Sequence, residues 1–177
     1  EGLIQQRGYN GFSYDDVARL VGIKKPSIHH HFATKSELAA VVAQRYTHRF
    51  REQLLEIEGR SAQAAERLTA YAALFEKTFN VEKHLCVCGM LGAEAGSLPE
   101  QVNHEVTQFF EVNLAWLRSI ATQGQRAGQL SSVLDPQNIA ETYLALLEGA
   151  MIVGRGMPKA AGPSNVASHF LKTLTPQ

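Results

Sequence analysis

Two lysines and three consecutive histidines stand within residues 22–38, GIKKPSIHHHFATKSEL, and side chains of these types bind anions, metal ions or nucleic acids. Adjacent helical residues point about 100° apart, so His29, His30 and His31 cannot all reach one metal ion. Lysine and imidazole groups do suit contacts with phosphates and base edges. We therefore expect no metal site, a buried structural role for His31, and nucleic-acid contacts from the other two histidines.

Short helices must position these side chains. Ser13 is an N-cap residue for a helix that Gly22 ends, and Pro26 suits the first turn of the next helix. Thr34 and Glu37 form a capping box that opens a longer helix. Two short helices joined by a tight turn are typical of a helix-turn-helix, whose second helix lies in the major groove of DNA.

The second helix of such a motif is anchored by a few apolar residues and is polar on its outer face. We expect Ile23, Ile28 and Phe32 to be the anchors. The side chains left facing outward are then Lys24, Lys25, Ser27, His29 and His30.

Residues 7–38, RGYNGFSYDDVARLVGIKKPSIHHHFATKSEL, resemble the DNA-binding segment of the tetracycline-repressor (TetR) family of transcription regulators. The family pattern runs G-[YF]-x-x-[TS]-[ST]-x-x-x-[IVL]-A, then a G-[VI] turn, then a short recognition helix ending in H-F; this sequence has Phe12 and Ser13 at the two [TS]-type positions. The stretch from Cys86 to Glu94 is similar to the C-L-x-G-x-L-x-x-E segment of many such regulators. The sequence departs from the family at Lys24, where Ser or Thr is common, and at His29, which replaces a common Tyr.

The resemblance implies an all-α fold with two domains. Residues 1–45 would form a helix-turn-helix DNA-binding domain, and residues 46–177 a larger helical ligand-binding and dimerisation domain. We expect the helix that Gly8 stops to begin upstream of Glu1. By the same resemblance, the recognition contacts fall on Lys25, Pro26, Ser27, His29 and His30, and the phosphate contacts on Lys35 and Tyr14.

Longer helices follow from the apolar periodicity of the remaining sequence. The helix opened by the capping box continues through residues 45–58, and another covers residues 61–79. Pro99, Pro136 and Pro163 each open a further helix. Residues 85–95 are rich in small side chains and form a weak helix on their own.

Charge is distributed unevenly along the chain. The 177 residues carry no formal net charge, but the first 50 contain seven Lys/Arg against four Asp/Glu, a net charge of +3. The predicted DNA-binding segment therefore lies in the more basic part of the chain, residues 1–50. Two cysteines are too few for a disulfide framework, and neither a signal peptide nor a membrane-spanning run is evident, so we expect a soluble, cytoplasmic protein without membrane contact.

The resemblance further implies a homodimer on a palindromic double-stranded DNA operator and a small-molecule effector, with no cofactor. Two helices per subunit would form the dimer interface, through Ala140, Tyr143, Leu144, Leu147, Ala150, Met151, Val166, Phe170 and Leu171. The effector pocket would draw on Phe75, Phe79, Cys86, Met90, His104, Phe109, Trp116 and Tyr143. The alternative in both cases is that these side chains only fill the core of one subunit.

Cys86 and Cys88 suggest a thiol or metal sensor as an alternative. On a regular helix they lie about 200° apart, so they share an ion only where the helix breaks, as Gly89 permits. A thiol enzyme would instead pair one cysteine with His84 or His104.

No G-x-S-x-G, Walker, dinucleotide or H-E-x-x-H motif is present, so we expect no enzyme. A third possibility is a helical ligand-binding scaffold that has lost DNA binding, in which Lys25 and Lys35 are dispensable. The favoured interpretation is a ligand-responsive transcriptional repressor, which a small-molecule inducer releases from its operator.

Overall fold

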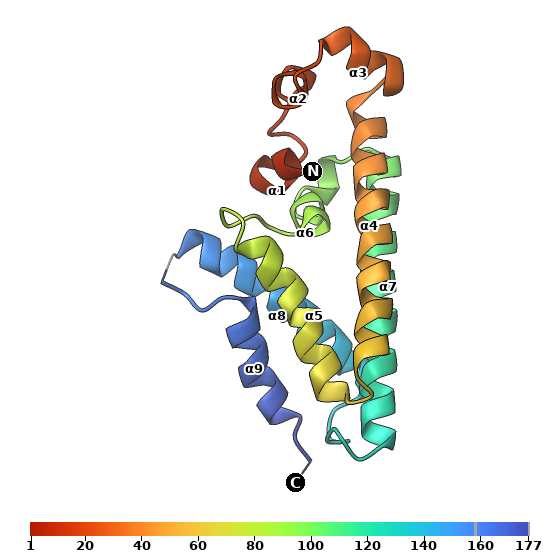
Figure 1. Cartoon of the computed structure of the whole chain (residues 1–177), viewed down its shortest axis with the longest axis vertical. Helices are drawn as coiled ribbons and strands as arrows, with labels where there is room; N and C mark the ends of the chain where they lie inside the picture. The colour runs from red at the N-terminus through yellow and green to blue at the C-terminus, as the bar shows by residue number, and fades with distance from the viewer. Residues whose placement is uncertain (158, 177) are drawn as a thin grey trace. The chain divides into compact units, whose positions relative to one another are not determined.

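Helices provide all the regular secondary structure of the described residues, 1–157 and 159–176, in the computed structural model (Figure 1). The predicted all-α fold is confirmed. The chain divides into two compact units. Unit 1 consists of Glu1–Arg49 and Val87–Phe110, and unit 2 of Phe50–Cys86 and Glu111–Gln177. The boundary between residues 45 and 46 stays a prediction, because unit 1 also includes a segment from the middle of the chain.

Unit 1 is built from short helices around the first part of a long one. Its elements are α1 (Gly2–Arg7), α2 (Tyr14–Val21), α3 (Lys25–His31), the first part of α4 (Lys35–Arg60), α6 (Val87–Gly92), the 3-10 helix η1 (Ala95–Ser97) and the start of α7 (Glu100–Arg126). The remaining parts of α4 and α7 belong to unit 2.

The ends of α2 are set by local signals. Ser13 and Asp16 form a capping box at its start, and Gly22 ends it in the left-handed region, with φ 76°. Pro26 stands in the first turn of α3, as predicted. The predicted Thr34 cap is also present, since its hydroxyl accepts a hydrogen bond from the Glu37 amide at 3.1 Å.

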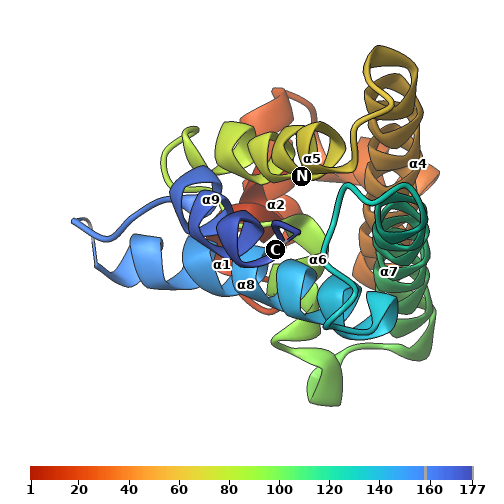
Figure 2. The same cartoon turned by 90° about the horizontal axis from the view of Figure 1, so that it is seen from below.

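Unit 2 contains a bundle of α5 (Ala64–Phe79), α8 (Pro136–Gly156) and α9 (Pro163–Thr173), which lie side by side in both views (Figures 1 and 2). Gly154 allows a close approach, because a Cβ there would lie 2.8 Å from the Phe79 ring. The bundle core contains few polar groups. One of them is the Tyr143 hydroxyl, which donates to the Leu68 carbonyl at 2.9 Å.

The prediction for the apolar anchors of α3 is partly wrong. Ile28 is buried, with 4% of its surface exposed, but Ile23 is 43% exposed. Ile23 precedes α3, whose N-cap is Lys24, so it does not lie on the helix face that carries Ile28. Leu20 and Val21 of α2 are exposed as well.

Candidate functional site

The outer face of α3 presents a continuous set of polar side chains. Ile28 is the buried residue of this helix and points toward the core of unit 1. Every residue predicted to contact bases is exposed on the same short helix: Lys25, Pro26, Ser27, His29 and His30, together with Lys24 at the N-cap. The structure thus brings the predicted recognition residues onto one exposed element.

The prediction that His31 is buried is wrong. It is exposed at the end of α3, and its ring lies edge-on to that of His30, with 5.3 Å between centroids. The chain leaves the helical conformation at Phe32, which is half-buried and takes the inward position instead. In the described part of the chain, no group of three or more His, Cys, Asp or Glu residues is placed to hold a metal ion.

Lys25 is held by an ion pair with the preceding helix. Its Nζ lies 2.9 Å from Asp15 Oδ2, and both side chains are largely exposed. Exposed pairs of this kind contribute about 0–1 kcal/mol, so a phosphate or a guanine acceptor can replace the carboxylate at little cost. The pair orients Lys25 without removing it from the surface.

Tyr14 lies behind the recognition helix. It is buried, its hydroxyl donates to the Phe32 carbonyl at 2.8 Å, and its ring packs edge-on against His29, with 4.6 Å between centroids. Burial raises the pKa of the Tyr14 phenol, with the Glu37 carboxylate as a smaller cause. In this conformation the hydroxyl proton is used within the protein and the ring orients His29, so a phosphate contact of Tyr14 stays a prediction.

Lys35, a predicted phosphate contact, also forms hydrogen bonds within unit 1. Its Nζ donates to the carbonyls of Tyr9 and Phe12, both at 3.0 Å, and lies 4.4 Å from the centroid of the Tyr9 ring. An ammonium group has three donors, so these bonds leave one for a phosphate. Lys35 therefore ties the start of α4 to the segment between α1 and α2, and its phosphate contact stays a prediction.

Glu94, which lies between α6 and η1, holds the same segment from the other side. Its carboxylate accepts hydrogen bonds from the Tyr9 amide, from the Asn10 amide at 3.2 Å and from Asn10 Nδ2 at 3.0 Å. Gly8 has φ 73°, and a Cβ there would lie 2.5 Å from Glu94 Oε2. The sequence analysis missed this role, because partners 84 residues apart leave no local signal.

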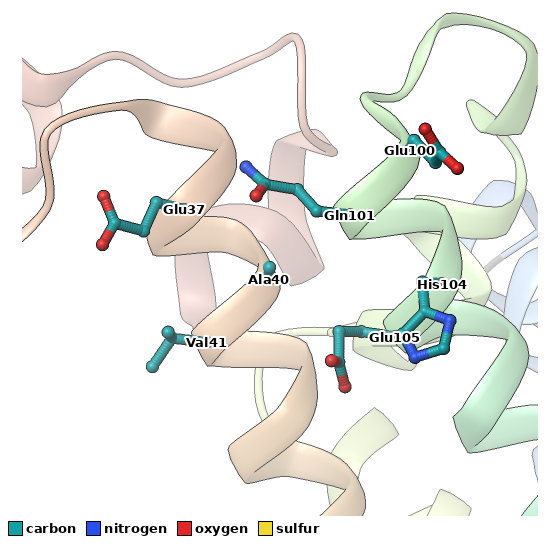
Figure 3. Close-up of a pocket in the computed structure, with 7 residues that line it drawn as sticks. All are labelled: Glu37, Ala40, Val41, Glu100, Gln101, His104 and Glu105. Atoms are coloured by element: carbon teal, nitrogen blue, oxygen red, sulfur yellow. The ribbon is translucent and has the colours of Figure 1, made fainter.

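The residues predicted to line the effector pocket are divided between the two units. Met90, His104 and Phe109 belong to unit 1, whereas Phe75, Phe79, Cys86, Trp116 and Tyr143 belong to unit 2. In unit 1, His104 lines an open hollow of about 500 Å³ between α4 and α7 (Figure 3). The other residues of this hollow are Glu37, Ala40, Val41, Glu100, Gln101 and Glu105, of which three are acidic.

Three unit 2 members of the predicted pocket lie around Tyr71. Trp116 stacks on its ring, with 5.4 Å between centroids, and Tyr143 and Phe75 lie at 6.2 Å and 5.3 Å. The Tyr71 hydroxyl donates to Asn113 Oδ1 at 2.7 Å, and burial raises its pKa well above the ordinary value. Apart from the half-buried Trp116, these aromatic side chains are buried. They therefore belong to the core of unit 2, and any contact with a ligand would be an additional role.

The residues predicted for the dimer interface on α8 are buried within a single chain. The inner face of this helix packs against α5 and α9, which covers Ala140, Tyr143, Leu144, Leu147, Ala150 and Met151. The core of unit 2 accounts for the apolar character of these six residues, so the prediction that they exceed the needs of one bundle is wrong for α8. The three residues predicted on α9, Val166, Phe170 and Leu171, are only half-buried, and their place in a dimer interface stays a prediction. The exposed residues of α8 are others: Asn138, Glu141, Thr142, Ala145, Ile152, Val153, Arg155 and Gly156.

Among the described residues, no helix has the length and apolar character needed to cross a membrane. Both cysteines are buried, Cys86 with 1% and Cys88 with 0% of the surface exposed. A thiol enzyme requires a sulfur that its substrate can reach, so this arrangement gives no support to that alternative.

Sequence and structure comparisons extend the resemblance over most of the chain. Residues 1–42 match the profile of bacterial regulatory proteins of the tetR family, and residues 64–170 match the tetracyclin repressor-like C-terminal domain. The HTH-type transcriptional repressor DhaR of Mycobacterium sp. (strain GP1) is 24% identical over 148 residues, 83% of this chain and 74% of DhaR. Transcriptional regulator AcuR of Cereibacter sphaeroides is 26% identical over 158 residues, 84% of this chain and 69% of AcuR.

A solved structure shows the same fold at higher identity. It is a transcriptional regulator of the TetR family from Agrobacterium tumefaciens, 33% identical, with a TM-score of 0.93 over 98% of this chain and 92% of the other. A TetR regulator from Legionella pneumophila is 27% identical, with a TM-score of 0.88 over 98% and 91% of the two chains. The predicted resemblance is confirmed: the chain belongs to the tetR family of bacterial regulatory proteins, which are helix-turn-helix regulators of transcription.

Proposed function

We propose that this chain is a cytoplasmic, homodimeric repressor that binds a palindromic operator through α3 and leaves it when a small molecule binds unit 2. The observation that supports DNA binding most directly is the exposed face of α3, with its predicted contact residues on one side and Ile28 buried on the other. Tyr14, Lys35 and Glu94 fix the elements around this face.

The roles on α3 follow from side-chain chemistry. Lys25 would contact a guanine or a phosphate, Ser27 offers a short donor, and the imidazoles of His29 and His30 reach base edges. His29 is packed against Tyr14 and is therefore the better oriented of the two rings. Lys35 would add a backbone contact with its remaining donor.

Replacing Lys25 or His30 with alanine should weaken operator binding by about 1–3 kcal/mol if the side chain reads a base. Lys25→Ala should also reduce the slope of log affinity against log salt by about 1 when a phosphate is contacted. Fluorescence anisotropy with an enriched operator at several salt concentrations measures both effects. Lys77→Ala, at an exposed position on α5, is the matched control, and equal behaviour of Lys25→Ala and Lys77→Ala would contradict the assignment.

The dimer interface is proposed on the exposed face of α8. Ile152 and Val153 are each 56% exposed there, and a Cβ at Gly149 or Gly156 would meet nothing within 4 Å. Small residues and exposed aliphatic side chains on one helix face permit close packing against the same helix of a second copy. The two recognition helices would then reach successive major grooves of a palindrome.

Ile152→Asp should convert the dimer into a monomer, because two carboxylates would be buried in a symmetric interface without partners. Operator affinity should fall with it, since each half-site would then be bound independently. Analytical ultracentrifugation reports the change in mass. Leu55→Asp, at a 68% exposed position of α4, should leave the dimer intact, and a dimeric Ile152→Asp would rule out this face.

The effector would act by stabilising a state of the dimer with a different spacing of its recognition helices. An effector shifts this equilibrium only as far as its affinities for the two states differ. The aromatic cluster around Tyr71 in unit 2 is the proposed contact region, because it combines large apolar surfaces with buried polar groups.

A further inference from the structure

A single acidic residue interrupts the most apolar helix of unit 2. The run from Leu144 to Val153 reads LALLEGAMIV, and Glu148 is its only charged residue. Its Oε1 atom is buried and has no hydrogen-bond partner among the described residues. A buried acceptor without a partner costs the full desolvation of that group, and such atoms in a folded protein often mark a place where something else binds.

The groups nearest to Glu148 do not supply the missing donor. The Cys86 thiol forms a hydrogen bond with the carboxyl group, and Oε1 nevertheless stays without one. Tyr71 is close enough to act on it electrostatically, but its hydroxyl proton is directed to Asn113 Oδ1. The Tyr143 hydroxyl proton is directed to the Leu68 carbonyl. None of these three groups therefore supplies a donor to Oε1.

The carboxyl group of Glu148 occurs in both protonation states near pH 7, because its pKa is about 7. Burial raises the pKa of Glu148 to about 7, and the hydrogen bond from Cys86 acts weakly in the opposite direction. A positive charge placed beside Oε1 would favour the ionised form, while a negative charge would oppose it.

Aromatic rings cluster around Tyr71. The Tyr71 ring is stacked with Trp116 and packed against Phe75 and Phe50. Its pKa is raised mainly by burial and also by the Glu148 carboxylate. Electron-rich ring faces attract organic cations, and the apolar ring surfaces suit an aryl or alkyl group.

We propose that Glu148 Oε1, together with Cys86 and the aromatic side chains around Tyr71, binds the positively charged end of an organic ammonium effector. This inference rests on the proposed effector response and adds the chemical class of the effector. An ammonium group brings up to three donors, so it satisfies Oε1 and compensates the buried charge in one contact. A carboxylate or phosphate effector would meet a like charge instead.

The test uses three probes of similar shape and different charge: phenethylammonium, 2-phenylethanol and 3-phenylpropionate. Trp116, the only tryptophan of the chain, stacks on Tyr71 and reports binding through its fluorescence. We expect a saturable response to phenethylammonium and weaker binding of the neutral alcohol by about 10- to 100-fold, because a charge-assisted hydrogen bond is lost. Phenylpropionate should bind more weakly still.

Glu148→Gln should weaken phenethylammonium binding by a similar factor and leave the affinity for 2-phenylethanol nearly unchanged. Glu141→Gln, on an exposed residue two turns earlier in α8, is the matched control. Affinity of the wild-type protein for the cation should rise with pH through about 7, since the ionised carboxylate is the binding form, and this pH dependence should vanish in Glu148→Gln.

Equal cation binding by the wild type and Glu148→Gln would overturn the proposal, as would folded wild-type protein that gives no saturable response to phenethylammonium. A parallel operator-release assay separates this outcome from failure of the proposed function. Cation binding through Glu148 without operator release would contradict the repressor mechanism and leave the site standing. Operator release from Glu148→Gln by an anionic or neutral molecule would contradict the ammonium site and leave the mechanism standing.

Discussion

Glu148→Gln should raise the free energy of unfolding by about 3 kcal/mol at pH 8. In the unfolded chain the carboxyl group ionises near its ordinary pKa of 4.5, whereas burial raises the pKa to about 7 in the folded protein. The folded state therefore binds more protons between these values, so its stability falls as pH rises from about 4.5 to 7. Glutamine keeps the shape of the side chain and carries no charge, so it avoids this loss.

Urea unfolding of both proteins at pH 5 and pH 8 measures the effect. The gain from Glu148→Gln should be small at pH 5 and close to its maximum at pH 8. Glu141→Gln should change stability little at either pH, because Glu141 is exposed. A gain from Glu148→Gln that is the same at both pH values would show that its cause is not the ionisation of Glu148.

Glu94→Ala should release the segment between α1 and α2. The substitution removes the acceptor for the amides of Tyr9 and Asn10 and for the Asn10 side chain. Hydrogen bonds to a charged group contribute about 1.5–3 kcal/mol each, so local opening of this segment should become easier by about 3 kcal/mol. Operator affinity should fall as well, since the same segment leads directly into α2.

Hydrogen exchange of the Tyr9 amide is the direct readout, with an expected acceleration of about 100-fold from a loss of about 3 kcal/mol. Glu94→Gln keeps one acceptor oxygen and should give an intermediate rate. Glu100→Ala, at an exposed position in the first turn of α7, serves as control. Unchanged protection of Tyr9 in Glu94→Ala would show that the carboxylate does not hold this segment.

Local sequence signals predicted the fold well. Ser13 and Gly22 set the ends of α2, and Pro136 and Pro163 stand at the starts of α8 and α9. Each of these signals acts within one helical turn, through capping or through the missing N–H of proline. The same is true of the recognition helix, whose polar outer face is visible in the sequence.

Features that depend on distant parts of the chain were not predicted. The exposure of Ile23 and His31 depends on what packs against α3, and the contact of Glu94 with Tyr9 joins residues 85 apart. On α8 the apolar periodicity did not distinguish the face buried within the chain from the face available to a partner. Glu148 did leave a signal, as the only acid in the run from Leu144 to Val153, and the sequence analysis overlooked it.

The central claim is that α3 reads DNA as part of a symmetric dimer. Selection of bound duplexes from a random pool by the folded full chain tests it most directly. We expect enrichment of a palindrome whose half-sites are about one helical turn apart or a multiple of it, with binding that weakens steeply as salt rises. A folded dimer that enriches no sequence would contradict the claim and would favour a ligand-binding scaffold without DNA binding.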